Sequence, residues 1–169
     1  MGDELISRGR RMFLGASAHA LSGAALTGAV MAAPSKAGAV KEPAVIGYPN
    51  EKGVAIERVT YPARNLGTKI VANLFKPPGF DPNRKHAAVV VTHPFGGVKE
   101  QTAGLYALRL AEEGFLTLAY DASYQGESGG EPRLMEVPAQ RLDDISCAID
   151  FLVQHPQVNA EQIGSLGIC

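Results

Sequence analysis

A cysteine ends the apolar run at residues 163–169, IGSLGIC, two positions after a glycine. A short strand that delivers a nucleophile into a sharp turn begins in this way, with G-x-C as the first half of the pattern G-x-C-x-G. Cysteine suits that position because its thiolate is a strong nucleophile, and a neighbouring base or helix terminus easily lowers its pKa. Cys169 is therefore a candidate nucleophile. The alternative is a cysteine that packs at the end of a strand.

A loop that could stabilise negative charge follows an earlier apolar run, in the sequence THPFGG at residues 92–97. Acyl transfer needs hydrogen-bond donors aimed at the oxygen on which charge develops. The backbone N–H of Phe95, directly after His93 and Pro94, is the candidate donor. The alternative is a turn that needs proline and glycine for its backbone geometry alone. His93 is also a candidate general base for Cys169.

The sequence GESGG at residues 126–130 satisfies the serine-nucleophile pattern G-x-S-x-G. That pattern works where a strand delivers the serine to a sharp turn and a helix follows. Here Ser128 stands eight residues after Tyr120, the last apolar residue of the preceding run, and Glu-Pro-Arg follows the motif. We predict that Ser128 belongs to a glycine-rich loop. The alternative is a serine nucleophile in a complete small enzyme.

The other histidines and the second cysteine give no sign of a metal or cofactor site. No metal-ligand spacing joins His19, His86 and His155. Cys147 stands in an apolar stretch of a helical pattern and is expected to pack. The chain contains neither the dinucleotide-binding pattern G-x-G-x-x-G nor a phosphate-binding G-K-[ST]. We therefore expect no metal and no cofactor.

The order of the secondary-structure patterns predicts an α/β fold. A β-hairpin is expected within residues 54–80, followed by strand, helix, strand, helix and strand. These five elements are expected at residues 87–92, 96–114, 115–121, 138–155 and 163–169. This order predicts right-handed crossovers and a mostly parallel sheet of buried strands. All three candidate stretches then follow the carboxyl ends of strands, where ligand sites form in such sheets.

Two local patterns add detail to the second half of the chain. The apolar stripe of the second helix is expected at Leu142, Ile145, Ile149 and Leu152. Asp143 and Asp144 fall off that stripe and are expected to face away from it. Asn159 and Gln162 could form a capping box around a single helical turn before the last strand.

Residues 1–39 differ in composition from the rest of the chain. The motif RRMFL at residues 10–14 resembles the twin-arginine export signal. Residues 12–33 contain no Lys, Arg, Asp or Glu, and AGA at residues 37–39 is a small-x-small cleavage candidate. We expect a signal segment, a partner in the twin-arginine export machinery, and a periplasmic or otherwise exported bacterial protein. The alternative is a membrane anchor, although alanine and glycine make this stretch weakly hydrophobic.

Composition limits the classes of function open to residues 40–169. The whole chain has a net charge of -1, and 20% of its residues are charged. It has no basic excess, so no nucleic-acid partner is expected, and its two cysteines do not make a disulfide framework. Residues 40–52, interrupted by Pro43 and Pro49, are expected to be an extended lead-in to a domain at residues 53–169.

Four segments together resemble the N-terminal part of an α/β hydrolase of the dienelactone-hydrolase-like branch. They are VVVTHPFGG, LAYDASYQGESGG, RLDDISCAIDFL and IGSLGIC. The second resembles the end of the family's fourth strand, where Asp121 and Ser128 match residues that shape a loop. The last resembles the fifth strand, which leads into the nucleophile. The resemblance covers residues 53–169. It implies an incomplete hydrolase domain, a small-molecule ester, lactone or similar acyl substrate, and no stable membrane partner.

The resemblance also implies roles for individual residues. Cys169 takes the place of the nucleophile, and the Phe95 N–H takes that of the first oxyanion-hole donor. Lys99 and Glu100 are expected near the rim of the site. A catalytic histidine comes late in the chain in this architecture, so His93 is expected to be structural.

The resemblance departs from the family after the nucleophile, where the acid, the histidine and the second oxyanion donor would follow. We therefore expect a fragment that is inactive alone and whose last strand is an unpaired apolar edge. The alternative is a non-catalytic exported α/β domain that binds a small molecule or a partner.

Overall fold

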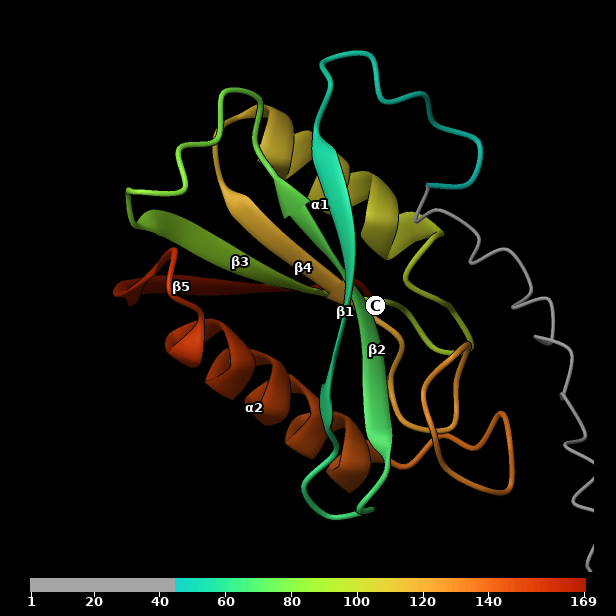
Figure 1. The fold of residues 1–169 in the computed structure, drawn as a ribbon. Helices are drawn as coiled ribbons and strands as arrows, with labels where there is room; N and C mark the ends of the chain where they lie inside the picture. The colour runs from blue at the N-terminus through green and yellow to red at the C-terminus, as the bar shows by residue number, and fades with distance from the viewer. Residues whose placement is uncertain (1–44) are drawn as a thin grey trace, which may run out of the picture. The chain divides into compact units, whose positions relative to one another are not determined.

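The structure, a computed structural model, describes residues 45–169 (Figure 1). The elements are β1 (Ala55–Pro62), β2 (Lys69–Lys76), β3 (His86–Thr92), α1 (Thr102–Glu112), β4 (Leu116–Tyr120), α2 (Pro138–Gln154) and β5 (Val158–Gly167). The signal segment expected at residues 1–39 and the start of the lead-in lie outside the described residues. Within residues 45–169, no helix combines the length and the hydropathy that crossing a membrane requires.

The five strands form one sheet in the order β1-β2-β4-β3-β5. β1 and β2 make the expected antiparallel hairpin, and β2 also pairs antiparallel with β4. β3 pairs parallel with β4 on one side and with β5 on the other. Helices α1 and α2 cover opposite faces of the sheet (Figure 1). The predicted α/β fold, with a hairpin followed by strand-helix-strand-helix-strand, is therefore confirmed.

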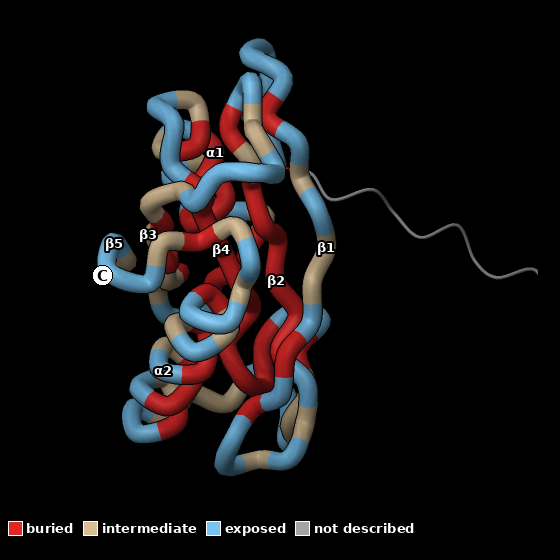
Figure 2. Tube along the Cα trace, turned by 60° about the vertical axis from the view of Figure 1, so that its left-hand side comes forward, coloured by how far each residue is buried: buried red, intermediate tan, exposed pale blue. Residues whose placement is uncertain are grey.

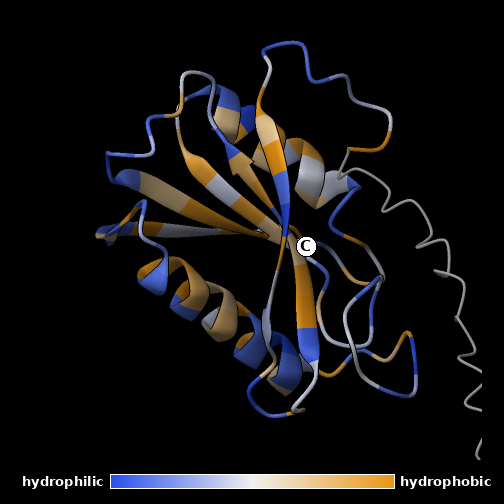
Figure 3. Cartoon of the chain, in the orientation of Figure 1, coloured by the Kyte–Doolittle hydropathy of each residue, from blue (hydrophilic) through white to orange (hydrophobic). Residues whose placement is uncertain are grey.

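The two faces of the sheet carry separate apolar clusters. One packs Leu118 of β4 against Ala148 and Leu152 of α2. The other packs Ala119 of β4 against Ala107 and Leu108 of α1. All five residues of β4 are buried (Figure 2), because this strand has neighbours on both sides and a helix on each face. The central strands are also largely hydrophobic (Figure 3). Burying one leucine side chain fully stabilises the folded state by about 1.5–3 kcal/mol. The apolar pattern of β4 therefore explains why this strand lies in the centre of the sheet.

Helix α2 buries a different face from the predicted stripe. Leu152 is fully buried as expected, whereas Leu142 is 68% exposed. The buried face of α2 consists of Gln140, Asp143, Asp144, Cys147, Ala148 and Leu152. The expectation that both aspartates face away is wrong, because donors within the protein form hydrogen bonds with both carboxylates. The backbone N–H and the hydroxyl of Ser123 each donate to Asp144, both at 2.7 Å.

Strand β5 is longer and more exposed than predicted. Asn159 and Gln162 do not cap a helical turn but lie within β5, where the pairing with β3 is irregular. The Asn159 side chain instead accepts the Glu161 N–H at 3.2 Å, a local contact that competes with helix formation. Most of β5 is exposed, and β3 is its one partner among the described strands (Figure 2). Among the described strands β5 therefore lies at an edge of the sheet, which agrees with the expected unpaired edge but not with the expected burial.

Candidate functional site

Phe95 and Cys169 line one cavity of about 520 Å³. The register of the parallel pair β3–β5 explains this proximity. Thr92 pairs with Gly167, so the residues that follow the two strands emerge at the same edge of the sheet. The loop after β3, the first turns of α2 and the end of β5 form the wall of the cavity. The two residues singled out from sequence thus share a single site.

Cys169 is exposed and directly follows an anchored residue. The Ile168 N–H donates to the Thr92 carbonyl at 3.2 Å, which continues the β3–β5 ladder to the position before the cysteine. The backbone of Cys169 has φ of 70°, in the left-handed region that non-glycine residues avoid. Such strained backbone is found where a strand presents a nucleophile at a sharp turn.

The loop that carries Phe95 is a tight turn. The Gly97 N–H donates to the Pro94 carbonyl at 2.9 Å, and Gly96 has φ of 65°. A side chain at Gly97 would meet that same carbonyl at 3.1 Å, so glycine fits this turn. Among the described residues, the Phe95 N–H donates to no protein acceptor. The turn therefore leaves the N–H of a cavity-lining residue without a protein acceptor.

His93 also lines the cavity, but its ring is held on both sides. The Ala122 N–H donates to Nε2 at 3.0 Å, so Nδ1 carries the proton and donates to the Pro94 carbonyl at 2.8 Å. Burial lowers the pKa of His93 below its ordinary value. The neutral ring thereby joins the loop after β3 to the loop after β4. These contacts agree with the structural interpretation of His93, since neither nitrogen is available to a thiol.

An ion pair of Glu136 and Arg141 forms the polar part of the cavity wall. Arg141 Nε lies 2.8 Å from Glu136 Oε2, and Arg141 Nη2 lies 3.2 Å from Oε1. The Gly96 N–H also donates to Glu136, at 2.9 Å. The sequence interpretation missed this pair. The available signal was an acid and a base five residues apart across the start of a helix.

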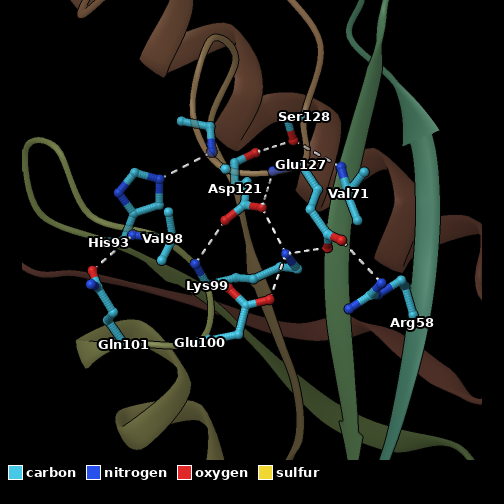
Figure 4. A network of polar contacts seen from close by, with 12 residues as sticks. Arg58, Val71, His93, Val98, Lys99, Glu100, Gln101, Asp121, Glu127 and Ser128 are labelled. Carbon is cyan, nitrogen blue, oxygen red and sulfur yellow. Dashed lines mark hydrogen bonds and ion pairs between the residues drawn. The ribbon is translucent and has the colours of Figure 1, made fainter. Parts of the chain in front are cut away.

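A second charged network surrounds Lys99, four residues after Phe95 (Figure 4). Lys99 is fully buried, and its Nζ lies 2.7 Å from a carboxylate oxygen of each of three residues, Glu100, Asp121 and Glu127. Burial opposes the charge on Lys99, but these hydrogen bonds outweigh burial and raise the pKa of the ammonium. The expectation that Lys99 and Glu100 lie at the rim is wrong, because both side chains point into this network.

Ser128 belongs to the same loop system and is 2% exposed. Its hydroxyl donates to the Asp121 carbonyl at 2.6 Å and accepts the Val71 N–H at 2.9 Å (Figure 4). Both functions of the hydroxyl are therefore used within the protein. The G-x-S-x-G motif is a structural loop that closes against β2, as the sequence context predicted.

The described residues contain no cluster of three or more histidine, cysteine or acidic side chains arranged to hold a metal ion. Cys147 is buried on α2, and burial raises the pKa of its thiol. It lies outside the cavity that contains Cys169.

Comparison with known proteins identifies the family. Residues 70–169 match the model of the dienelactone hydrolase family. The chain belongs to this family. The match includes both Phe95 and Cys169, and it covers β2 from Ile70 onward and all of β3, β4 and β5.

Individual relatives agree with this family. Protein YcjY of Escherichia coli (strain K12) is 54% identical over 63% of this chain and 35% of its own length. The crystal structure of protein PA2218 from Pseudomonas aeruginosa superimposes with a TM-score of 0.66 at 44% identity, over 72% of this chain and 37% of that one. Polyketide transferase claH of Penicillium crustosum is 35% identical over 60% of this chain and 33% of its own length. The chain thus spans about a third of the length of these relatives.

Proposed function

We propose that Cys169 is the nucleophile of an acyl-transfer site in a protein that hydrolyses an ester, a lactone or a similar small acyl substrate. The observation that carries this proposal is that one cavity is lined both by Cys169, in left-handed backbone, and by Phe95, whose N–H has no protein acceptor in the described residues. Family membership supports hydrolysis of ester-like compounds. The name of the relative claH, a polyketide transferase, is consistent with group transfer.

In the proposed reaction, the Cys169 thiolate attacks the carbonyl carbon of the substrate and forms a carbon–sulfur bond. The carbonyl oxygen becomes an oxyanion that accepts the Phe95 N–H, and such a donor contributes about 2.7–4 kcal/mol to the transition state. Collapse of the intermediate breaks the bond to the leaving oxygen, which departs with the electron pair. Water then hydrolyses the thioester, releases the acid and restores the thiol.

We infer that residues 1–169 can carry out acylation but do not turn over. Deacylation needs a general base for the attacking water. His93 is the one histidine that lines the cavity in the described part of the chain, and both its nitrogens are already bonded. We therefore expect a stoichiometric burst of acylation without sustained hydrolysis.

The test compares Cys169 in the full chain with the cysteine of an unstructured peptide of sequence GSLGIC. Both are treated with nitrophenyl acetate, and the acyl-cysteine is quantified by mass spectrometry. We expect acylation of the protein to be about tenfold faster or more. Phe95→Pro removes the N–H and should return the rate to that of the peptide, whereas Phe95→Ala keeps the N–H and should lose far less. Equal rates for the two variants would exclude the oxyanion role.

We also propose that residues 1–39 direct export through the twin-arginine pathway, on the RRMFL motif and the uncharged stretch after it. The test replaces Arg10 and Arg11 by lysine and follows the chain in cell fractions. Retention of the variant in the cytoplasm, with the parent cleaved and exported, supports the proposal. A parent chain that is uncleaved and membrane-bound would support an anchor instead.

A further inference from the structure

We propose that the cavity accepts uncharged, apolar acyl groups and rejects acyl groups that carry a carboxylate. This inference rests on the proposed function, because it assigns the cavity to the acyl group bound to Cys169. The argument comes from the pairing of the cavity's charged groups and from the composition of its remaining wall.

Arg141 is the cation of the cavity wall, and its Nε and Nη2 donors are engaged within the protein. Its Nε and Nη2 bind the two carboxylate oxygens of Glu136 in a bidentate pair. Nη2 also donates to the Pro94 carbonyl at 3.2 Å, and Nη1 lies against the His93 ring at 3.4 Å. A substrate carboxylate would have to displace Glu136 to form a bidentate pair with Nε and Nη2.

Glu136 is held as firmly as its partner. Besides Arg141, its Oε1 accepts the Gly96 N–H at 2.9 Å and the Gln125 side-chain amide at 3.3 Å. Its side chain is only 11% exposed. The charges of Glu136 and Arg141 compensate each other, and the doubly bonded His93 ring adds none. The wall therefore offers no net positive charge to an anionic acyl group.

The rest of the wall is largely apolar. Leu142 and Ile145 come from α2, Ile168 from the end of β5, and the exposed Phe95 ring from the loop after β3. An alkyl chain placed against these side chains is removed from water, which is favourable by about 0.8 kcal/mol per methylene group. A carboxylate in the same place loses hydration and faces a cation whose charge Glu136 already compensates.

The experiment compares two esters that differ only in the end of the acyl chain. They are nitrophenyl hexanoate, which is neutral, and the mono-nitrophenyl ester of adipic acid, which is anionic and equally long. The Cys169 thiolate displaces nitrophenolate from either ester and becomes S-acylated. Acylation of Cys169 in the full chain is measured by mass spectrometry and divided by the rate for the GSLGIC peptide, which cancels the intrinsic reactivity of each ester.

We expect the acceleration over the peptide to be about tenfold larger, or more, for the hexanoate than for the adipate ester. Equal acceleration of both esters, or a preference for the adipate ester, would overturn the inference while leaving the proposed nucleophile intact. If neither ester reacts faster with the protein than with the peptide, the proposed function fails and the inference falls with it.

Three variants test the assignment to the Glu136–Arg141 pair. Glu136→Gln removes the compensating charge and should shift the preference severalfold toward the adipate ester. Glu113→Gln removes the same charge from an exposed residue outside the cavity and should leave the ratio as in the parent chain. Leu142→Lys adds an unpaired cation at an exposed position of the wall and should also favour the adipate ester.

The inference can still be tested if one of these variants misfolds. Circular dichroism first establishes that each variant is folded. If Glu136→Gln folds and its ratio does not move, the inference is wrong. If Glu136→Gln does not fold, the parent ratio and Leu142→Lys decide, and an unchanged ratio in Leu142→Lys would show that the acyl chain lies outside the cavity.

Discussion

The ammonium of Lys99 lies 2.7 Å from Asp121 Oδ2, and both side chains are fully buried. The same carboxylate accepts the backbone N–H of Lys99 and of Glu127, each at 2.8 Å. Asp121 follows β4, and Lys99 belongs to the segment that joins β3 to α1. The pair therefore ties together the two loops that follow neighbouring parallel strands. Because Phe95 lies in the first of these loops, this network holds the backbone that carries the proposed oxyanion donor.

Removing the cation of this network should strongly destabilise the domain. In Lys99→Met the carboxylates of Glu100, Asp121 and Glu127 lose their shared partner, and breaking a buried ion pair costs about 3–5 kcal/mol. The free energy of unfolding in urea measures the loss. The control is Lys52→Met, because the Lys52 side chain is 54% exposed and its pairs contribute at most about 1 kcal/mol. Similar losses for the two variants would contradict the role assigned to Lys99.

Gly126 should be intolerant of any side chain. A Cβ there would lie 2.2 Å from Asp121 Oδ2, and the backbone has φ of 47°. Gly79 is the matched control, since its φ is 69° but nothing lies within 4 Å of its Cβ position. We expect Gly79→Ala to cost about 1 kcal/mol from backbone strain and Gly126→Ala to cost about 1–3 kcal/mol more from the clash. Equal unfolding free energies for the two variants would show that Asp121 can move away from a side chain at position 126 without a loss of stability.

The stability of the domain should fall as the pH drops below 6.5, partly because of His93. Burial lowers the pKa of His93 below 6.5 in the folded protein, so the unfolded chain binds its proton first. The stability contributed by the neutral ring is present above pH 6.5 and is lost as the pH falls toward the folded pKa. His93→Gln keeps an acceptor for the Ala122 N–H but cannot titrate.

The measurement for His93 is the urea unfolding free energy between about pH 7.5 and pH 5. His93→Gln should show a shallower decline than the parent chain. Some decline should remain, because burial also lowers the pKa of His155. A decline of unchanged steepness in His93→Gln would argue against a buried neutral ring.

The two thiols should differ sharply in reactivity. Cys169 is exposed, whereas Cys147 is buried and burial raises the pKa of its thiol. Iodoacetamide should alkylate Cys169 at least about tenfold faster than Cys147 in the folded chain. Peptide mapping by mass spectrometry gives both rates, and urea should bring them together. In Cys169→Ser, rapid alkylation that persists at Cys147 would show that α2 does not protect it.

Much of the fold followed from local patterns. The alternation in residues 70–74 and the apolar runs before Thr92 and Asp121 predicted strands. Such patterns can be read from the sequence because they involve only residues that are adjacent in the chain. The first helix was predicted to stop at Gly114 and ends at Glu112. Local reasoning failed at Asn159, where a capping pattern lies inside a strand. This segment forms a strand because it pairs with β3. The local sequence carries no information about that distant partner.

By itself, the sequence determined the order of the elements, the rejection of Ser128 as a nucleophile, and the position of Phe95 and Cys169 after strand ends. Each of these depends on residues adjacent in the chain. Only the tertiary structure decided which charged side chains are buried. Lys99 and Asp144 look solvent-exposed in sequence, and they are buried where residues more than twenty positions away hydrogen-bond to them, Asp121 to Lys99 and Ser123 to Asp144. A side chain's solvation depends on what packs against it, and that is a property of the folded chain.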